Sequence, residues 1–291
     1  MPETLQIPQL IEDVEELLSL PDVVMRANEL IDSETAGVES IAEVIALDPS
    51  LTAQLLRLVN SAFYGLPSKI ETISRAITVI GVQELRSLIL SASAVEVFNK
   101  VAPEAIDMND FWFRSVYVGL AAKQLSGDRR RAEMFFLMGL MHDVGKIVLF
   151  MKNDAIANQM LREAVASGKS LQQIEKETMG FTLSQVSSAL LQNWGLAETL
   201  YEPISIMYEN AQASPYFKDA AILRLAARLS DCTEPEVKGR NAEKLSAVLE
   251  DKELLRAAGT KADDLEDIMN DVNLYCFDVL SVINPEASLV F

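Results

Sequence analysis

The stretch from Asp48 to Gly65 reads DPSLTAQLLRLVNSAFYG and carries signals for both ends of a helix. The Asp48 carboxylate can accept the free N–H groups of a helix start, and Pro49 suits the first helical position. Apolar residues then recur at steps of three and four on one face: Leu51, Leu55, Leu58 and Val59. Glycine and proline follow at 65 and 67. The pattern predicts a buried amphipathic helix that ends near Asn60.

The same helical spacing extends outward in both directions from this stretch. The expected helices are residues 7–20, 23–31, 70–80, 82–98, 111–125, 132–150, 153–167, 171–179, 183–193 and 220–229. Ser40 is expected to cap a further helix, and turns are expected at Trp194-Gly195 and Ser214-Pro215. No alternating strand pattern appears. The sequence therefore predicts an all-α protein.

The residues after 231 become more acidic but keep an apolar helical period. Its members are Leu265, Ile268, Met269, Val272, Cys276, Val279 and Ile283. We therefore expect residues 231–291 to form a packed helical extension.

The composition limits the classes of function that this protein can have. The 291 residues carry a formal net charge of −18, and 49% of them are hydrophobic. An acidic chain lacks the basic surface that nucleic acid or an anionic membrane requires. The first residues do not resemble a signal peptide, two cysteines are too few for a disulfide framework, and no membrane-spanning run is evident. We expect a soluble cytoplasmic protein that binds neither nucleic acid nor membranes.

The stretch LMGLMHDVGK, residues 137–146, carries the most chemistry. Adjacent His142 and Asp143 can ligate metal ions in two-metal hydrolases, and Lys146 can neutralise a phosphate. However, His142 is the only histidine in the chain, and a metal site needs more than two donors. We therefore expect His142 and Asp143 to bond with each other or with the backbone inside the bundle.

Several motifs together resemble the HDOD family, the HD-related output domain of bacterial signalling proteins. They are LPDVV at 20–24, IALDPSLTAQLLRLVNSAFYG at 45–65, SRAI at 74–77, FW at 111–112 and MHDVGK at 141–146. The resemblance covers residues 8–230. It implies an N-terminal helical sub-bundle (8–102) packed on a degenerate HD-like sub-bundle (103–230), followed by the C-terminal extension (231–291).

HDOD domains resemble HD and HD-GYP phosphohydrolases in fold but are regarded as lacking their activity. Here the family's remaining histidine positions are also changed: Arg114 stands where a first histidine is expected, Leu183 and Ile206-Met207-Tyr208 replace others, and Ala227 replaces a closing aspartate. Arg114 brings a fixed positive charge that repels a cation, and we expect it to pair with Asp143 in place of a metal.

The resemblance thus implies a degenerate HD pocket, made of Arg114, His142, Asp143 and Lys146, with no metal, no cofactor and no catalytic residue. The implied function is a regulatory module that contacts other signalling proteins: a histidine kinase, a response regulator or a cyclic dinucleotide enzyme. A groove between the two sub-bundles is the expected docking site.

Two alternatives stay open. One is a residual metal-dependent phosphohydrolase, with His142 and Asp143 as metal ligands and Lys146 on phosphate. The other is a nucleotide sensor without turnover, in which Arg114 and Lys146 hold the phosphate. The basic run at residues 129–131 is expected to be a solvated loop tip.

Overall fold

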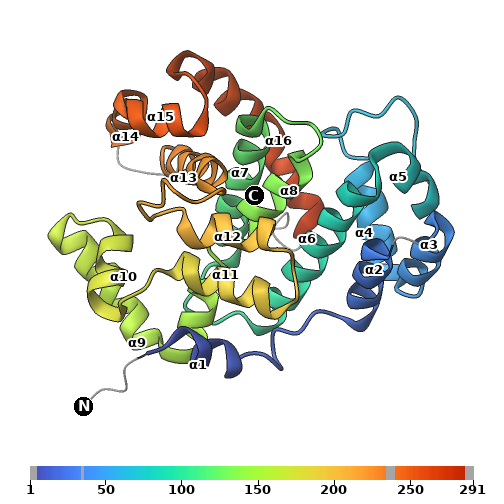
Figure 1. The fold of residues 1–291 in the computed structure, drawn as a ribbon, viewed down its shortest axis with the longest axis horizontal. Coiled ribbons are helices and arrows are strands. Elements are labelled where there is room, and N and C mark those ends of the chain that lie inside the picture. The colour runs from blue at the N-terminus through green and yellow to red at the C-terminus, as the bar shows by residue number, and fades with distance from the viewer. Residues whose placement is uncertain (1–4, 34–35, 234–239, 286–291) are drawn as a thin grey trace.

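The computed structural model describes residues 5–33, 36–233 and 240–285, and these ranges contain helices and no strand (Figure 1). The N-terminal part holds α1 (Ile7–Glu12), α2 (Asp22–Asp32), α3 (Val38–Ala46), α4 (Pro49–Val59), α5 (Ile73–Ile80) and α6 (Val82–Val101). The HD-like part holds α7 (Met108–Ser126), α8 (Ala132–Met141), α9 (Val144–Ser167), α10 (Leu171–Met179), α11 (Leu183–Asn193), α12 (Glu198–Ile206) and α13 (Phe217–Asp231). The extension holds α14 (Arg240–Glu250), α15 (Lys252–Ala258), the 3₁₀ turn η1 (Ala262–Asp264) and α16 (Leu265–Ile283). The predicted all-α class is confirmed.

Helix α4 starts after Asp48 and ends at Asn60, as predicted from the sequence. The Asp48 Oδ1 atom accepts hydrogen bonds from the backbone N–H groups of Ser50 (2.9 Å) and Leu51 (3.0 Å). Asn60 ends the helix, and its amide bonds to both backbone groups of Ile70. The Ser40 prediction is wrong, because α3 begins after Gly37 without a side-chain cap and Ser40 lies inside it.

The first helix is shorter than predicted, and it packs on the HD-like part instead of the N-terminal part. Residues 7–20 were expected to be one helix, but α1 ends at Glu12 and turns follow. The carbonyl of Leu18 is taken by the Trp194 indole, whose Nε1–H donates to it at 2.7 Å. Helix α1 packs on α9 and α11 of the HD-like part (Figure 1). The chain therefore crosses from one sub-bundle to the other between α1 and α2.

The core is centred on the crossing of α7 and α8, where two glycines face each other. A Cβ atom at Gly139 would lie 2.5 Å from the Cα atom of Gly119, so the two backbones are in direct contact. Helices α6, α12 and α13 pack on α8, and α13 and α16 pack on α7. This crossing fixes the position of the end of α8, which carries His142.

Helices α8 and α9 together are long and apolar enough to cross a membrane, which the inspection of the sequence did not reveal. However, 78% of their most apolar window is buried inside the protein. Such burial is typical of a core helix, and it accounts for the apolar composition of residues 132–167 without a bilayer.

The C-terminal extension is packed on both sub-bundles. Helix α16 confirms the apolar period seen in the sequence and contacts α4, α6 and α7. Near its end, Trp112 Nε1–H donates to Asn99 Oδ1 (2.7 Å), and Asn99 Nδ2–H donates to Asn284 Oδ1 (3.1 Å). This relay joins α6, α7 and the residue after α16. Helix α15 packs on α13.

Candidate functional site

The His-Asp pair interrupts what the sequence predicted as one helix over residues 132–150. His142 ends α8, and Asp143 precedes the first residue of α9 with φ −116° and ψ 10°. The His142 Nδ1 atom lies 2.7 Å from the carbonyl oxygen of Gly139. A carbonyl oxygen only accepts, so Nδ1 carries the proton. Burial lowers the pKa of His142 despite the nearby Asp143 carboxylate, and the ring is therefore neutral at pH 7.

The glycine of the His-Asp-Val-Gly-Lys stretch is required by close packing. The Gly145 N–H donates to the Ser187 hydroxyl at 2.8 Å. A Cβ atom at Gly145 would lie 2.2 Å from the carbonyl oxygen of Leu183. The first turn of α9 therefore rests directly on α11, and this contact holds the His-Asp pair at its place in the bundle.

The four residues predicted for the degenerate pocket line one cavity of about 390 Å³. Its wall consists of Arg114, His142, Asp143, Lys146, Leu161, Ser170, Leu171, Gln172, Glu175, Leu183, Ser184, Tyr208 and Asp231. A neighbouring hollow of about 460 Å³ shares Arg114, Asp143 and Lys146 with it. The structure thus brings the predicted residues together and adds acidic side chains from α10 and α13.

Arg114 forms an ion pair, but its described partner is Asp231 at the end of α13, not the expected Asp143. Burial alone would lower the pKa of the Arg114 guanidinium, but Asp231 and then Asp143 raise it above its usual value. Ala227, where the resemblance places an aspartate, is buried on α13. One helical turn later, Asp231 supplies a carboxylate to the same region, and Arg114 binds it.

Glu175 lines the pocket although it was not predicted from the sequence. It is 3% exposed, and its Oε2 atom accepts the backbone N–H of Leu183 at 3.0 Å. Burial raises the pKa of Glu175 to about 7; Asp143 adds to the rise, while the Leu183 N–H and Lys146 oppose it. A carboxyl group with this pKa is partly protonated at neutral pH.

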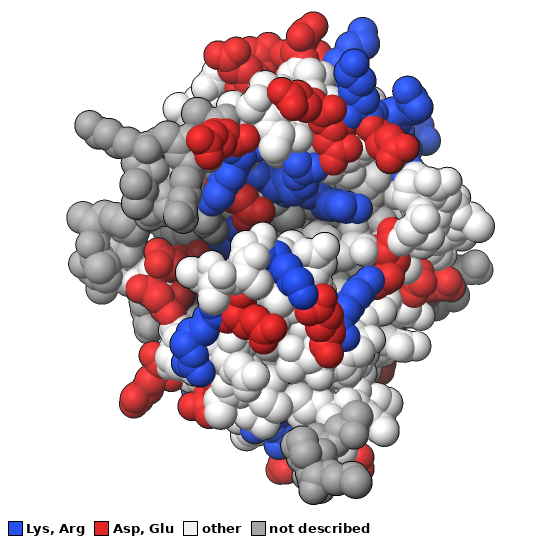
Figure 2. Space-filling model, turned by 90° about the vertical axis from the view of Figure 1, so that its left-hand side faces the viewer, with Lys and Arg blue, Asp and Glu red and all other residues white. Residues whose placement is uncertain are grey.

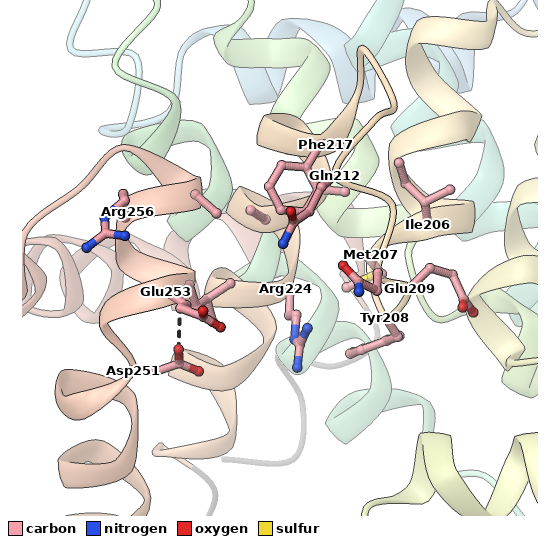
Figure 3. Close-up of a pocket in the computed structure, with 15 residues that line it drawn as sticks. Ile206, Met207, Tyr208, Glu209, Gln212, Phe217, Arg224, Asp251, Glu253 and Arg256 are labelled. Carbon is pink, nitrogen blue, oxygen red and sulfur yellow. Dashed lines mark hydrogen bonds between the residues drawn. The ribbon is translucent and has the colours of Figure 1, made fainter.

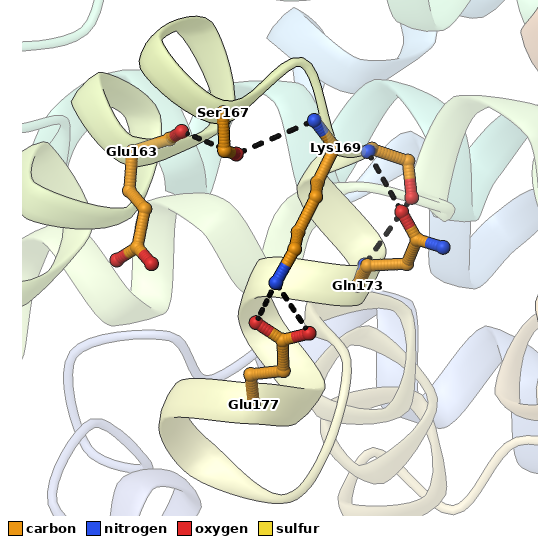
Figure 4. Close-up of polar contacts among 6 residues, drawn as sticks. Glu163, Ser167, Lys169, Gln173 and Glu177 are labelled. Atoms are coloured by element: carbon orange, nitrogen blue, oxygen red, sulfur yellow. Dashed lines mark hydrogen bonds and ion pairs between the residues drawn. The ribbon is translucent and has the colours of Figure 1, made fainter.

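The direction of Glu175 is set by the turn between α9 and α10 (Figure 4). Gly168 ends α9 in the left-handed conformation, with φ +69°. Ser170 and Gln173 then form a capping box at the start of α10. The Lys169 ammonium group binds both oxygens of Glu177 at 2.7 and 2.8 Å. These contacts fix the rotation of α10, which turns Glu175 toward the cavity.

The residues of this cavity do not fit a metal ion. Across residues 5–33, 36–233 and 240–285, no group of three or more His, Cys, Asp or Glu side chains is arranged to hold one. The Asp231 carboxylate is bound by Arg114, and Leu183 offers no donor atom. The Arg114 guanidinium, fixed among these carboxylates, repels a divalent cation. The carboxylates of the pocket are therefore balanced by cationic side chains of the protein.

A groove was predicted between the two sub-bundles, and the structure has a small hollow at this place. A hollow of about 190 Å³ lies between α6 and α8 and includes Arg130 and Arg131. Within the run predicted to be solvated, Arg131 pairs with Asp219 and lies over the Phe135 ring, 5.1 Å from its centre. Arg131 therefore anchors α13 to α8, whereas Arg129 is exposed.

This all-helical arrangement, with a His-Asp pair between two core helices and no complete set of metal donors in its described part, defines a degenerate HD-type domain. The sequence pattern of the HDOD domain matches residues 17–210. The chain belongs to the HDOD family, and the resemblance stated from its motifs is confirmed.

A relative is also found by sequence similarity. An uncharacterised protein of Treponema pallidum (strain Nichols) is 22% identical over 231 residues, which cover 76% of this chain and 44% of the relative. The chain thus matches less than half the length of that protein.

Three crystal structures share the fold. A protein from Shewanella amazonensis SB2B with the provisional name of a phosphohydrolase is 26% identical, with a TM-score of 0.72 and coverage of 94% of this chain and 96% of that one. An HDOD domain protein of unknown function from Geobacter sulfurreducens is 20% identical (TM-score 0.67, coverage 95% and 96%). A protein from Marinobacter aquaeolei VT8, provisionally named a signal transduction protein, is 19% identical (TM-score 0.68, coverage 96% and 61%). The last two similarities show the fold alone.

Proposed function

We propose that this chain is a regulatory protein without catalytic turnover, which transmits signals through contacts with other proteins. The observation that carries the proposal is the Arg114–Asp231 ion pair in the cavity that also contains His142 and Asp143. An arginine bound to a carboxylate occupies the position at which a hydrolase of this fold needs metal donors. The His-Asp pair then serves the packing of α8 and α9.

Two further features support a regulatory role. The chain belongs to a family of output domains, and the Marinobacter aquaeolei protein with the same fold has a provisional name in signal transduction. The partner classes that we propose are a histidine kinase, a response regulator or a cyclic dinucleotide enzyme, in a cytoplasmic setting. An acidic protein of net charge −18 selects partners with complementary basic surfaces.

The test combines metal content with activity. The purified full chain is analysed for bound metal and assayed with Mn²⁺ or Mg²⁺ on bis(p-nitrophenyl) phosphate and on cyclic di-GMP. We expect no stoichiometric metal and no turnover. Stoichiometric metal, together with turnover that disappears in His142→Ala, would falsify the proposal.

The second candidate function is a residual phosphohydrolase. It is favoured by one observation, the provisional name of the Shewanella amazonensis protein, which is 26% identical over nearly the whole chain. In that case Lys146 would bind the phosphate of the substrate beside Asp143. Arg114→Ala distinguishes the two candidate functions, because it removes a positive charge that repels a metal ion. The variant should raise metal affinity and turnover if the site is catalytic.

A further inference from the structure

A second, more spacious hollow lies between the HD-like sub-bundle and the C-terminal extension (Figure 3). Its volume is about 670 Å³, within the usual range of small-molecule sites, about 300–1,000 Å³. Helices α12 and α13 form one wall and α15 forms the other, so most of the hollow lies outside residues 17–210 that define the family. We call it the α13–α15 hollow.

The α13–α15 hollow contains an arginine, Arg224, that forms no ion pair among the described residues, although the Asp251 carboxylate lies near enough to interact with its charge. The Arg224 side chain projects into it from α13 (Figure 3) and makes no hydrogen bond or ion pair within the described residues. Other carboxylates around the hollow are already neutralised: Asp251 binds Arg228, and Glu209 binds Lys176 at 2.7 Å. Arg224 is therefore available to an anion.

No ion pair joins Arg224 to the remaining carboxylate, Glu253, within the described residues. Glu253 lies in the first turn of α15, where the free backbone N–H groups favour a negative charge. Arg256 adds a second cation at the far rim of the hollow (Figure 3). Figure 2 shows Lys and Arg side chains gathered around the hollowed middle of this face, below the acidic C-terminal helices. The local charge thus favours an anion although the whole chain is acidic.

The rest of the wall suits a flat ring. Phe217 lies above Arg224 with the Gln212 amide beside it (Figure 3), and Met207 and Leu254 supply buried apolar surface. The side chains of Gln212 and Asn210 make no hydrogen bond among the described residues, so their donors and acceptors are available to the edge of a heterocycle. Phe217 and Arg224 lie two helical turns apart on α13, so the wall offers separate contacts for a base and for a phosphate.

We propose that the α13–α15 hollow binds a purine mononucleotide, with the phosphate on Arg224 and the base against Phe217. The sensor alternative predicted from the sequence placed the phosphate on Arg114 and Lys146. We prefer Arg224, because Arg114 is bound to Asp231 whereas Arg224 forms no ion pair among the described residues. A ligand in this hollow would touch both α13 and α15, so nucleotide binding would add contacts between the HD-like sub-bundle and the extension.

The test is calorimetric titration of the full chain with AMP, GMP and inorganic phosphate. We expect AMP or GMP to bind at least tenfold more tightly than phosphate. Arg224→Ala should weaken the nucleotide about tenfold or more, the loss expected for one charged hydrogen-bonding group. Arg224→Gln serves as a second variant that removes the charge but keeps a polar side chain, and it should also weaken the nucleotide. Arg129→Ala removes an exposed arginine from a distant loop and should leave the affinity unchanged.

A further control tests whether the nucleotide binds in the α13–α15 hollow or in the cavity around Arg114. Arg114→Ala should leave nucleotide affinity within about twofold of the wild type, with folding of each variant verified by circular dichroism. The proposal is overturned if neither AMP nor GMP binds, if phosphate alone binds as tightly as both, or if Arg114→Ala weakens binding as much as Arg224→Ala does. It is also overturned if both Arg224 variants bind like the wild type.

Discussion

The ammonium nitrogen of Lys123 lies 4.0 Å from the centre of the Phe63 ring. Lys123 belongs to α7 of the HD-like sub-bundle, whereas Phe63 belongs to the Asn-Ser-Ala-Phe-Tyr-Gly stretch that follows α4. Lys123 also pairs with Glu133, and the two side chains are only 18% and 6% exposed. The most specific motif of the N-terminal part thus contacts a buried charge of the other sub-bundle.

The first prediction concerns this buried pair. Lys123→Ala should destabilise the protein by roughly 3–5 kcal/mol, because it leaves the Glu133 carboxylate buried without a cation. The double variant Lys123→Met, Glu133→Leu should recover most of that loss. Urea denaturation measures both. Lys100→Ala, in an exposed pair with Glu96, is the control and should cost less than about 1 kcal/mol. Equal losses in the single and the double variant would contradict this account.

The second prediction concerns the glycine after the His-Asp pair. Gly145→Ala should cost about 1–3 kcal/mol or more, because a Cβ atom there would meet the Leu183 carbonyl oxygen at 2.2 Å. The matched control is Gly37→Ala: its φ is −81°, and the nearest atom is the Glu39 Oε2 at 3.7 Å. Thermal unfolding compares the two variants. Similar melting temperatures for both would show that α9 does not rest on α11 so closely.

The third prediction is a pH dependence that originates at Glu175. Its pKa is raised from 4.5 to about 7, so its contribution to stability is fully present below pH 4.5 and is lost as the pH rises through 7. The loss in the wild type should be roughly 3 kcal/mol between pH 5 and pH 8. Glu175→Gln stays neutral and should be more stable than the wild type at pH 8 but not at pH 5.

The pH dependence that originates at Glu175 must be separated from that of His142. The pKa of His142 is lowered below 6.5, so its contribution is present above pH 6.5 and is lost as the pH falls. The difference in unfolding free energy between wild type and Glu175→Gln cancels that term, since His142 is common to both. Glu163→Gln, exposed on α9, is the control. A constant difference from pH 5 to pH 8 would refute the role of Glu175.

The fourth prediction tests how the extension is anchored. Asn99→Leu leaves the buried Trp112 N–H without its acceptor at 2.7 Å and breaks the bond to Asn284. We expect a loss of about 1–3 kcal/mol and faster amide exchange at the end of α16. Asn158→Leu removes only a local bond within α9 and should change stability by less than about 1 kcal/mol. Unchanged exchange in α16 would show that Asn99 does not hold the extension.

The elements that the sequence predicted correctly are those governed by local rules. The Asp48 cap, the turn at Trp194-Gly195 and the apolar face of α16 depend on residues within a few positions of one another. The early end of α1 was not predictable in this way: residues 13–18 form turns, and the Leu18 carbonyl at their end binds Trp194 from far along the chain. Ser40 was selected for its residue type, although the chain has no need of a side-chain cap at that point.

In the candidate site, too, only the residues that local sequence patterns or the family resemblance mark out could be predicted. The pair His142-Asp143 was evident because the two residues are adjacent, and Arg114 because of the family resemblance. Glu175 enters the cavity through the fold of the turn between α9 and α10, and Asp231 through the packing of α13 on α7. Asp231 lies four residues after Ala227, so the helical period could have selected it once a carboxylate was sought on that face.

The contact between Gly119 and Gly139 has a mechanical consequence. No side chain separates the two main chains at this point, so a shift of α7 would be passed directly to α8. Helix α16 packs on α7, and His142 stands at the end of α8. We therefore expect a displacement of the C-terminal helices to reach the His-Asp pair through this contact.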